Sequence, residues 1–254
     1  MKKILIVAVL LLSVTVSGWS ANFQKTKKSA EQGSSVDQSI LGGLYLLGEE
    51  VPQDYKQAFY WYKKSAEQGW FLAQFCLGAM YENGQGVLQN YKKAFYWYEK
   101  SAKHGHPMAK HNLGLMYAYG HGVPQDYELA VDFFTMAAEQ GNMDAPYNIG
   151  VIYNHGGYGV PQDYDKALHW YMIAAGMGSN KAPHNLAFLS YYGQGVPQNY
   201  IAAYAWISIA VKLGNVDALK NRDIIAKQLS PQQLSEALRI GIKLQDTLSS
   251  ETKE

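Results

Sequence analysis

The sequence predicts an all-α solenoid, that is, a row of stacked helix–turn–helix repeats, and three observations carry this prediction. The block Val-Pro-Gln-Asp-Tyr, or a close variant of it, starts at Val51, Val87, Val123, Val160 and Val196, at intervals of 36, 36, 37 and 36 residues. Small and aromatic residues follow each block at helical spacing, and no segment reads as a strand. A strict period of this length is typical of two-helix units that bury their apolar faces against their neighbours.

The first twenty residues have the pattern of a secretory signal peptide. Lys2 and Lys3 precede the apolar run Ile4–Leu12, and small residues follow up to Ser20. The run is shorter than the ~20 residues that cross a bilayer comfortably. We therefore expect cleavage near Ser20, with a retained anchor as the alternative. The mature chain is predicted to be periplasmic or secreted and to have no membrane span.

The charge balance of the chain is close to zero, since 22 Lys and Arg residues stand against 21 Asp and Glu residues. Such a chain has no overall attraction to nucleic acid, so we expect no nucleic-acid partner. Cys76 is the only cysteine. An exported chain with one cysteine has no internal disulfide, and Cys76 is expected to be a small buried residue.

The first helix of each unit is predicted to begin at the tyrosine of the block. The residue before this tyrosine is always Asp or Asn, whose side-chain oxygen can cap a helix start; these residues are Asp54, Asn90, Asp126, Asp163 and Asn199. An alanine and a large aromatic residue, such as Ala94 and Trp97, then share one face, and we expect the ring to fill the gap beside the alanine. The helix is expected to end at a glycine with a left-handed backbone, which is Gly69, Gly105, Gly141, Gly178 or Gly214.

The second helix of each unit carries a Leu-Gly pair or a close relative of it, and it ends in a Gly-x-Gly turn such as Gly84-Gln85-Gly86. These turns lack the preceding strand and the Lys-Ser/Thr partner of a phosphate-binding loop, so we interpret them as structural. The turn at residues 156–159 has one extra residue, which accounts for the single 37-residue interval.

The combined pattern A-x-x-x-L-G-x-x-Y-x-x-G-x-G-V-x-x-D-Y-x-x-A-x-x-W-x-x-x-A-A-x-x-G resembles the Sel1-like repeat, a relative of the tetratricopeptide repeat. The resemblance covers about residues 29–222, with Phe133 in place of Trp, Ser190 in place of Tyr and Glu50 in place of Gly among its departures. It implies a right-handed α/α superhelix. It also implies a non-enzymatic scaffold that binds a protein or peptide through its concave face, in bacterial envelope function or in contact with a host.

The last part of the chain is predicted to close the array. Ser230 and Pro231 have the pattern of a helix start, and the helix is expected to run from Pro231 to about Gln245 with Leu234, Leu238 and Ile242 as the apolar face that covers the last repeat. The expected parts of the chain are a signal peptide at residues 1–20, a partial repeat at 21–50, the Sel1-like array at 51–222, and a capping helix and tail at 223–254.

Candidate binding residues are those that vary from repeat to repeat while the packing residues do not. In related repeats the Leu-Gly helix lines the concave side. The variable positions of that helix are Phe75, His111, Tyr147 and His184, with Glu82, Asn154 and Tyr191 seven residues further along. Rings and amides at these positions suit an extended peptide with exposed backbone groups; ordinary solvated surface is the alternative. Asn112, Asn148 and Asn185 share a further position and are expected to help hold neighbouring helices together.

The sequence contains no recognisable catalytic or metal-binding set. Its seven histidines are spread over different repeat positions, and His104 and His106 have no Cys or carboxylate cluster beside them to complete a zinc site. We therefore expect no catalytic residue, no metal and no cofactor. The alternative is a cell-wall or β-lactam-hydrolysing enzyme, because helicobacter cysteine-rich proteins of the resembled family are reported to act on β-lactams. Those proteins carry a cysteine pair in each repeat, whereas this chain has only Cys76.

Overall fold

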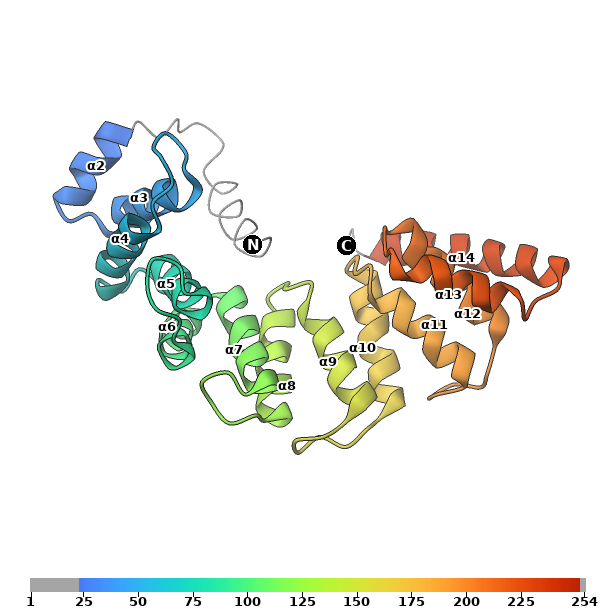
Figure 1. The fold of residues 1–254 in the computed structure, drawn as a ribbon. Coiled ribbons are helices and arrows are strands. Elements are labelled where there is room, and N and C mark those ends of the chain that lie inside the picture. Colours follow the sequence, from blue (N-terminus) through green and yellow to red (C-terminus); the bar gives the residue numbers. More distant parts are fainter. Residues whose placement is uncertain (1–22, 252–254) are drawn as a thin grey trace. The chain divides into compact units, whose positions relative to one another are not determined.

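The computed structural model describes residues 23–251, within which thirteen α helices follow one another (Figure 1). The predicted signal segment lies outside these residues. The helices that begin at a tyrosine of the repeated block, here called the Tyr helices, are α4 (Tyr55–Glu67), α6 (Tyr91–Lys103), α8 (Tyr127–Ala138), α10 (Tyr164–Gly176) and α12 (Tyr200–Lys212). The helices with the Leu-Gly pair or its counterpart, here called the Leu-Gly helices, are α3 (Ser35–Leu47), α5 (Phe71–Asn83), α7 (Pro107–Tyr119), α9 (Ala145–His155) and α11 (Ala182–Tyr192).

Three further helices lie at the ends of this series, α2 (Phe23–Glu31) before it and α13 (Asp217–Ala226) and α14 (Pro231–Glu251) after it. The chain divides after Gln125 into two compact units. Within each unit a Leu-Gly helix packs most extensively against the Tyr helix that follows it. Among residues 23–251, no helix combines the length and the apolar character that crossing a membrane requires. The all-α repeat architecture is thus confirmed, and the hand of the superhelix stays a prediction.

The predicted helix caps are confirmed in all five blocks. Asp54 accepts hydrogen bonds from the backbone N–H groups of Lys56 and Gln57 at 2.8 and 3.1 Å. The four equivalent residues each accept one such bond at 2.9–3.0 Å. The five glycines after the Tyr helices all have a φ between +81° and +91°, which glycine adopts without a Cβ clash.

The glutamine of the repeated block has a role that the sequence analysis did not assign. Its side-chain amide donates to a backbone carbonyl in the last turn of the preceding Leu-Gly helix at 2.7–2.9 Å, and this bond recurs in all five repeats, at Gln53, Gln89, Gln125, Gln162 and Gln198. The carbonyls at a helix end have no partner within the helix. The glutamine therefore closes the Leu-Gly helix just as the next residue opens the Tyr helix.

The ring that packs on the glycine of the Leu-Gly pair belongs to the residue after the predicted tryptophan. Tyr62, Tyr98 and Tyr171 are fully buried. The tryptophan position is buried as predicted in two repeats, at Trp61 and Trp206, and only half-buried in two others, at Trp97 and Trp170. The close approach is to the glycine of the Leu-Gly pair. A Cβ added there would lie 2.9, 2.7 or 2.6 Å from the ring of Tyr62, Tyr98 or Tyr171 in three repeats. Consecutive helix residues point about 100° apart, so either the tryptophan or the following tyrosine could face the glycine. The rotation of the Tyr helix about its axis determines which of them does.

The last repeat makes the same interface with different residues. Ala187 stands in place of the glycine and Ile207 in place of the tyrosine, and both are fully buried in one apolar cluster. A larger residue on one helix is thus accompanied by a smaller one on the other, as a close-packed interior requires.

The hydroxyl of each buried tyrosine reaches toward the next Leu-Gly helix. Tyr98 donates to Glu82 Oε2 at 2.6 Å and also hydrogen-bonds Asn112. Tyr171 faces Asn185 without a well-aligned bond. In the first repeat the equivalent position holds Cys76, and the buried Tyr62 hydroxyl faces its thiol without completing a hydrogen bond. The shared asparagine position therefore does contribute to holding neighbouring helices together at Asn112.

Replacing Cys76 with asparagine is expected to stabilise the protein by about 1 kcal/mol, because a buried hydroxyl gains the hydrogen bond that it now lacks. The free energy of unfolding in urea measures this. Cys76→Ala is the matched control, since it also removes the thiol but provides no partner for Tyr62. If the asparagine variant is no more stable than the alanine variant, the missing bond is not what limits this site.

The closing helix α14 runs to Glu251, beyond the predicted end near Gln245, and it uses a different face from the one predicted. Leu238 and Ile242 are 48 % and 62 % exposed, so their assignment to the buried face is wrong. Ala237 and Gly241 are buried instead, and α14 packs on α12 and reaches α10. A Cβ on Gly241 would lie only 3.2 Å from the carbonyl oxygen of Ala205. Small residues in α14 therefore allow the two helices to approach closely.

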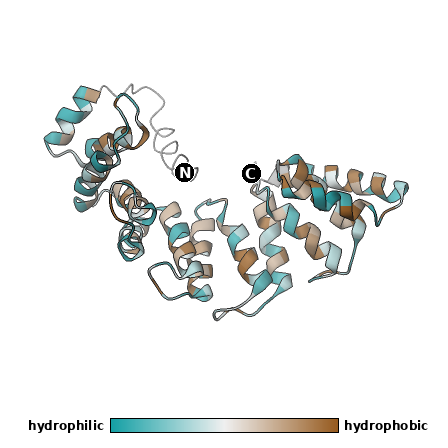
Figure 2. Cartoon of the chain, viewed as in Figure 1, coloured by the Kyte–Doolittle hydropathy of each residue, from teal (hydrophilic) through white to brown (hydrophobic). Residues whose placement is uncertain are grey.

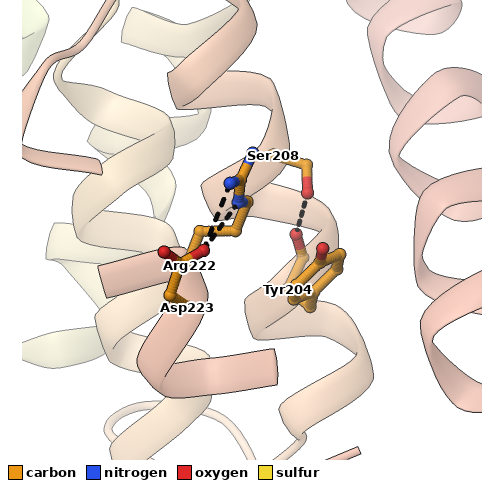
Figure 3. Close-up of polar contacts among 4 residues, drawn as sticks. All are labelled: Tyr204, Ser208, Arg222 and Asp223. Atoms are coloured by element: carbon orange, nitrogen blue, oxygen red, sulfur yellow. Dashed lines mark hydrogen bonds and ion pairs between the residues drawn. The ribbon is translucent and has the colours of Figure 1, made fainter. Parts of the chain in front are cut away.

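The decay of the repeat pattern after α12 is visible in α13. Arg222 and Asp223 occupy the Leu-Gly positions there, and they pair with each other at 3.1 Å on the surface, where Asp223 is exposed (Figure 3). On the neighbouring α12, Ser208 donates back to the carbonyl of Tyr204 at 2.7 Å (Figure 3). A charged pair in place of Leu-Gly indicates that no further Tyr helix packs on α13.

Candidate interaction surface on the Leu-Gly helices

The seven predicted binding residues all lie on Leu-Gly helices, and they fall into two groups, one in each unit. Phe75, Glu82 and His111 belong to the first unit. Tyr147, Asn154, His184 and Tyr191 belong to the second. Phe75 and His111 are buried, at 3 % and 7 % exposure, and the other five are half-buried. Each side chain is therefore held partly by its neighbours.

In the first unit, the buried Tyr98 of α6 brings Phe75 and Glu82 of α5 together. Its ring centroid lies 5.6 Å from that of Phe75, and its hydroxyl donates to the Glu82 carboxylate. Burial, followed by the negative charge of Glu82, raises the pKa of Tyr98 well above its usual value. The hydroxyl therefore remains a proton donor and orients the half-buried carboxylate.

His106 joins the same group of residues, although the sequence analysis placed it among the unassigned histidines. Its ring lies 4.7 Å from Phe75 and 5.7 Å from Phe71, and its Nδ1 accepts the backbone N–H of Ala109 at 3.2 Å as the cap of α7. Burial lowers the pKa of His106 to about 4. The signal that could have identified it is Pro107, which is typical of the first residue of a helix.

In the second unit, α11 carries a row of rings along one side. His184, Phe188 and Tyr192 are spaced four residues apart, and successive ring centroids are separated by 4.8 and 6.0 Å. Tyr191 contacts Tyr192 at 5.0 Å and Tyr200 of α12 at 5.1 Å. Phe188 and Tyr192 were missed in the sequence, although four-residue spacing from His184 places them on the same face of a helix.

The remaining members of the second group are fixed by contacts with neighbouring helices. Nδ2 of Asn221 in α13 lies 2.8 Å from His184 Nε2. Burial lowers the pKa of His184, and the Asn185 hydrogen bond and the Asp217 charge oppose this, so the ring is neutral at neutral pH. Tyr147 lies under the ammonium of Lys181, at 5.5 Å. The backbone carbonyl of Asn154 accepts from Gln162 at 2.8 Å.

This surface presents aromatic rings, amides and the Glu82 carboxylate for contact and hydrogen bonding. Cys76 is buried, and burial raises the pKa of its thiol to about 12, so it does not supply a thiolate nucleophile at neutral pH. Over the described part of the chain, no three His, Cys, Asp or Glu residues are grouped so that they could hold a metal ion. His104 is exposed and caps the end of α6, whereas His106 caps the start of α7.

The comparisons with known proteins agree with this architecture. The sequence profile described as "Sel1 repeat" matches residues 37–70, 72–106, 107–142, 144–179 and 181–215. Each of the five matched segments covers all or most of one Leu-Gly helix and all of the Tyr helix that follows it. No curated protein sequence matches the chain.

The similar solved structures include two that match this chain over most of its length. One is c5321, a protective antigen of uropathogenic Escherichia coli strains that displays the same repeat fold; it is 33 % identical with a TM-score of 0.78, and the match covers 90 % of this chain and 49 % of that one. The other is a Sel1 repeat protein of Oxalobacter formigenes, 28 % identical with a TM-score of 0.69, over 87 % of this chain and 99 % of that one. The present chain thus spans about half the length of the Escherichia coli protein.

Proposed function

The chain belongs to the Sel1 repeat family, and on this basis we propose that it is an exported scaffold that binds a protein or peptide through its Leu-Gly helices. Sel1 repeat proteins are in general non-enzymatic scaffolds for contacts between proteins. In the proposal these helices line the concave face of the superhelix. Export places the partner in the bacterial envelope or on a host.

The observation that carries the choice of surface is the row of rings on α11. Tyr192 is 61 % exposed, and the half-buried Phe188 and His184 continue the row. The neighbouring contacts hold these rings in place before any partner arrives, so little side-chain freedom is lost on binding. Exposed rings beside amide groups match an extended peptide, whose side chains contact the rings and whose backbone groups bond the amides.

Removing two of these rings is expected to weaken peptide binding by at least about tenfold, since a central aromatic residue at an interface contributes on the order of 1–2 kcal/mol. Peptides are first selected from a displayed random library on the full chain. Their affinities are then measured by calorimetry for the natural chain and for Phe188→Ala combined with Tyr192→Ala.

The matched control is Tyr60→Ala combined with Tyr96→Ala, which removes two exposed rings from Tyr helices of the first unit. The control is expected to bind the selected peptides as the natural chain does. Equal affinity of both double variants would remove α11 as the binding surface. Urea unfolding of each variant separates loss of a contact from loss of folding.

No observation favours the hydrolase alternative, because the helicobacter proteins that suggested it carry a cysteine pair in each repeat and this chain has only Cys76. Nitrocefin turnover by the pure protein tests that alternative directly. The export proposal rests on the first twenty residues. A mass measurement of the protein recovered from cells tests it, and an intact Met1 would contradict cleavage near Ser20.

A further inference from the structure

The near-zero charge of the whole chain conceals a strongly basic pair of helices. The Tyr helices of the first unit, α4 and α6, together carry seven lysines against two glutamates. The equivalent helices of the second unit, α8 and α10, carry one lysine against three acidic residues. Figure 2 shows hydrophilic residues predominating on α2, which has three more lysines and belongs to the same unit.

Two identical aromatic groups lie on these helices, one repeat apart. In α4, the Tyr60 ring stands nearly perpendicular to that of Trp61 at 5.0 Å, and the Lys64 ammonium lies 4.7 Å from the Tyr60 ring centroid. In α6, Tyr96 and Lys100 repeat this arrangement, with Trp97 at 5.1 Å and a Lys100–Tyr96 distance of 4.9 Å. Tyr60 and Tyr96 are 46 % and 47 % exposed.

The two groups recur on successive Tyr helices of the first unit, and α5 packs against both of these helices. Lys28, Lys64 and Lys100 occupy the same repeat position in α2, α4 and α6. Tyr81 of α5 contacts Phe59 of α4 on one side, at 5.4 Å, and lies under the Lys93 ammonium of α6 on the other, at 5.3 Å. We name the set Lys28, Tyr60, Lys64, Tyr96 and Lys100 the Lys-Tyr face.

The last repeat shows what the same positions look like when another helix covers them. Ala205 and Ile209 of α12 correspond to Tyr60 and Lys64, and both are buried. The closing helix α14 lies against them, with Gly241 close to Ala205. Small apolar residues allow that close approach. Tyrosines and lysines at the same positions are too large for such a close helix contact, and they suit a partner with a hydrated, charged surface.

We propose that the Lys-Tyr face docks peripherally on an anionic lipid bilayer. The first unit has lysines but no arginine. Lysine acts as a mobile point charge, whereas specific recognition of a carboxylate or phosphate favours the planar fork of arginine. Clustered lysines attract anionic lipid surfaces without such geometry. Tyrosine and tryptophan rings prefer the headgroup level of a membrane, and on this face they lie beside the lysine ammonium groups.

The test measures binding of the full chain to vesicles of phosphatidylglycerol and phosphatidylcholine by co-sedimentation. Binding is expected to fall steeply as salt rises and to weaken on the order of tenfold in a variant with Tyr60→Ser, Lys64→Gln, Tyr96→Ser and Lys100→Gln. Binding to vesicles of pure phosphatidylcholine, if it persists in high salt, is attributed to the apolar run Ile4–Leu12 at the N-terminus. That run is unchanged in the variant, so the difference between the two chains reports the face.

A matched control makes the same changes of charge and ring number outside the Lys-Tyr face, with Tyr119→Ser, Tyr158→Ser, Lys220→Gln and Lys227→Gln; all four residues are exposed. It is expected to bind anionic vesicles as the natural chain does. Acetylation of lysines in the presence of vesicles gives a second readout, in which Lys64 and Lys100 are protected and Lys220 and Lys227 are not.

Equal vesicle binding by the Lys-Tyr variant and the control overturns the proposal. Binding to polyglutamate without binding to anionic vesicles also overturns it and assigns the face to an acidic protein. Neither result affects the peptide site, because the two proposals rest on different helices and their variants are measured with different ligands.

Discussion

Replacing Gly86 with alanine is expected to destabilise the protein by about 3 kcal/mol or more, as measured by urea unfolding. Gly86 is the second glycine of its Gly-x-Gly turn and has a φ of +69°. A Cβ there would overlap the carbonyl oxygen of Tyr55, the first residue of the preceding Tyr helix. Two costs therefore add, namely a left-handed backbone for a residue with a Cβ, about 1–2 kcal/mol, and a backbone displacement at the junction of two repeats.

The control for this prediction is Gly69→Ala. Gly69 also has a positive φ, +91°, but a Cβ there would meet no atom within 4 Å. It is expected to cost only the conformational part, about 1–2 kcal/mol. Gly122 and Gly105 provide the same contrast one repeat later, since a Cβ on Gly122 would lie 2.6 Å from the carbonyl carbon of Tyr91 and one on Gly105 would meet nothing. Equal losses at both members of a pair would show that contact between repeats adds nothing.

The exception at Glu50 fits this explanation. Glu50 occupies the position of Gly86 one repeat earlier, and it keeps the left-handed backbone, with a φ of +62°. Its carboxylate accepts the backbone N–H of Phe23, the first residue of α2, at 3.0 Å. The side chain at this position thus bonds the start of α2.

Lowering the pH from about 6.5 to about 4 is expected to remove roughly 3 kcal/mol of stability through His106 alone. Burial among the rings of Phe71 and Phe75 lowers its pKa to about 4 in the folded protein. The unfolded chain binds this proton near pH 6.5, so between these values it holds more protons than the folded protein. The stabilisation is therefore complete above pH 6.5 and is lost as the pH falls toward 4. Protonation also abolishes the Nδ1 acceptor that caps α7.

The variant His106→Asn isolates this effect. Asparagine is a good helix cap that does not titrate, so the variant keeps the cap and loses the pH-dependent term. The measurement is the free energy of unfolding at several pH values between 4 and 7. The natural chain is expected to lose stability more steeply than the variant, and parallel curves would show that the pKa of His106 is the same in the folded and the unfolded chain. His184 contributes in the same direction in both chains, because burial lowers its pKa too.

The parts of the fold that could be predicted are those that depend on a few residues near each other in sequence. The caps at Asp54 and its equivalents and the left-handed glycines are local, because an Asx side chain reaches only the first turn of its own helix. Each such pattern is a weak signal by itself, but it recurs in five repeats at the same positions. The all-α class followed from the period, since a two-helix unit has no other way to bury its apolar side.

The parts that were wrong or missed depend on how a helix is rotated against its neighbour. The sequence pattern placed Trp97 in the interface, but Tyr98 fills it, and it placed Leu238 and Ile242 on the buried side of α14, where Ala237 and Gly241 lie instead. Helix rotation decides between the adjacent rings of Trp97 and Tyr98, whereas in α14 hydrophobicity favoured the larger residues. Close helix contact favours small ones, because only they let two backbones approach.

The candidate site shows the same division. Periodicity alone indicated which positions of the Leu-Gly helices vary, and it placed His184 and Tyr191 on one helix. It did not indicate that Phe75 and His111 would be buried, that Phe188 and Tyr192 would extend the row of rings, or that His106 would join Phe75. These outcomes depend on side chains from other helices, which the order of residues along one helix does not contain.

The sequence by itself determined the family, the repeat length and the ends of the Tyr helices, because each of these follows from short-range chemistry repeated at a constant interval. Only the tertiary structure decided which ring fills each interface, which side of α14 is buried and where the lysines of α4 and α6 gather with Tyr60 and Tyr96. The physical reason is that the net charge and the repeat period are properties of whole segments of the chain. Burial and contact, in contrast, depend on which side of each helix faces its neighbour.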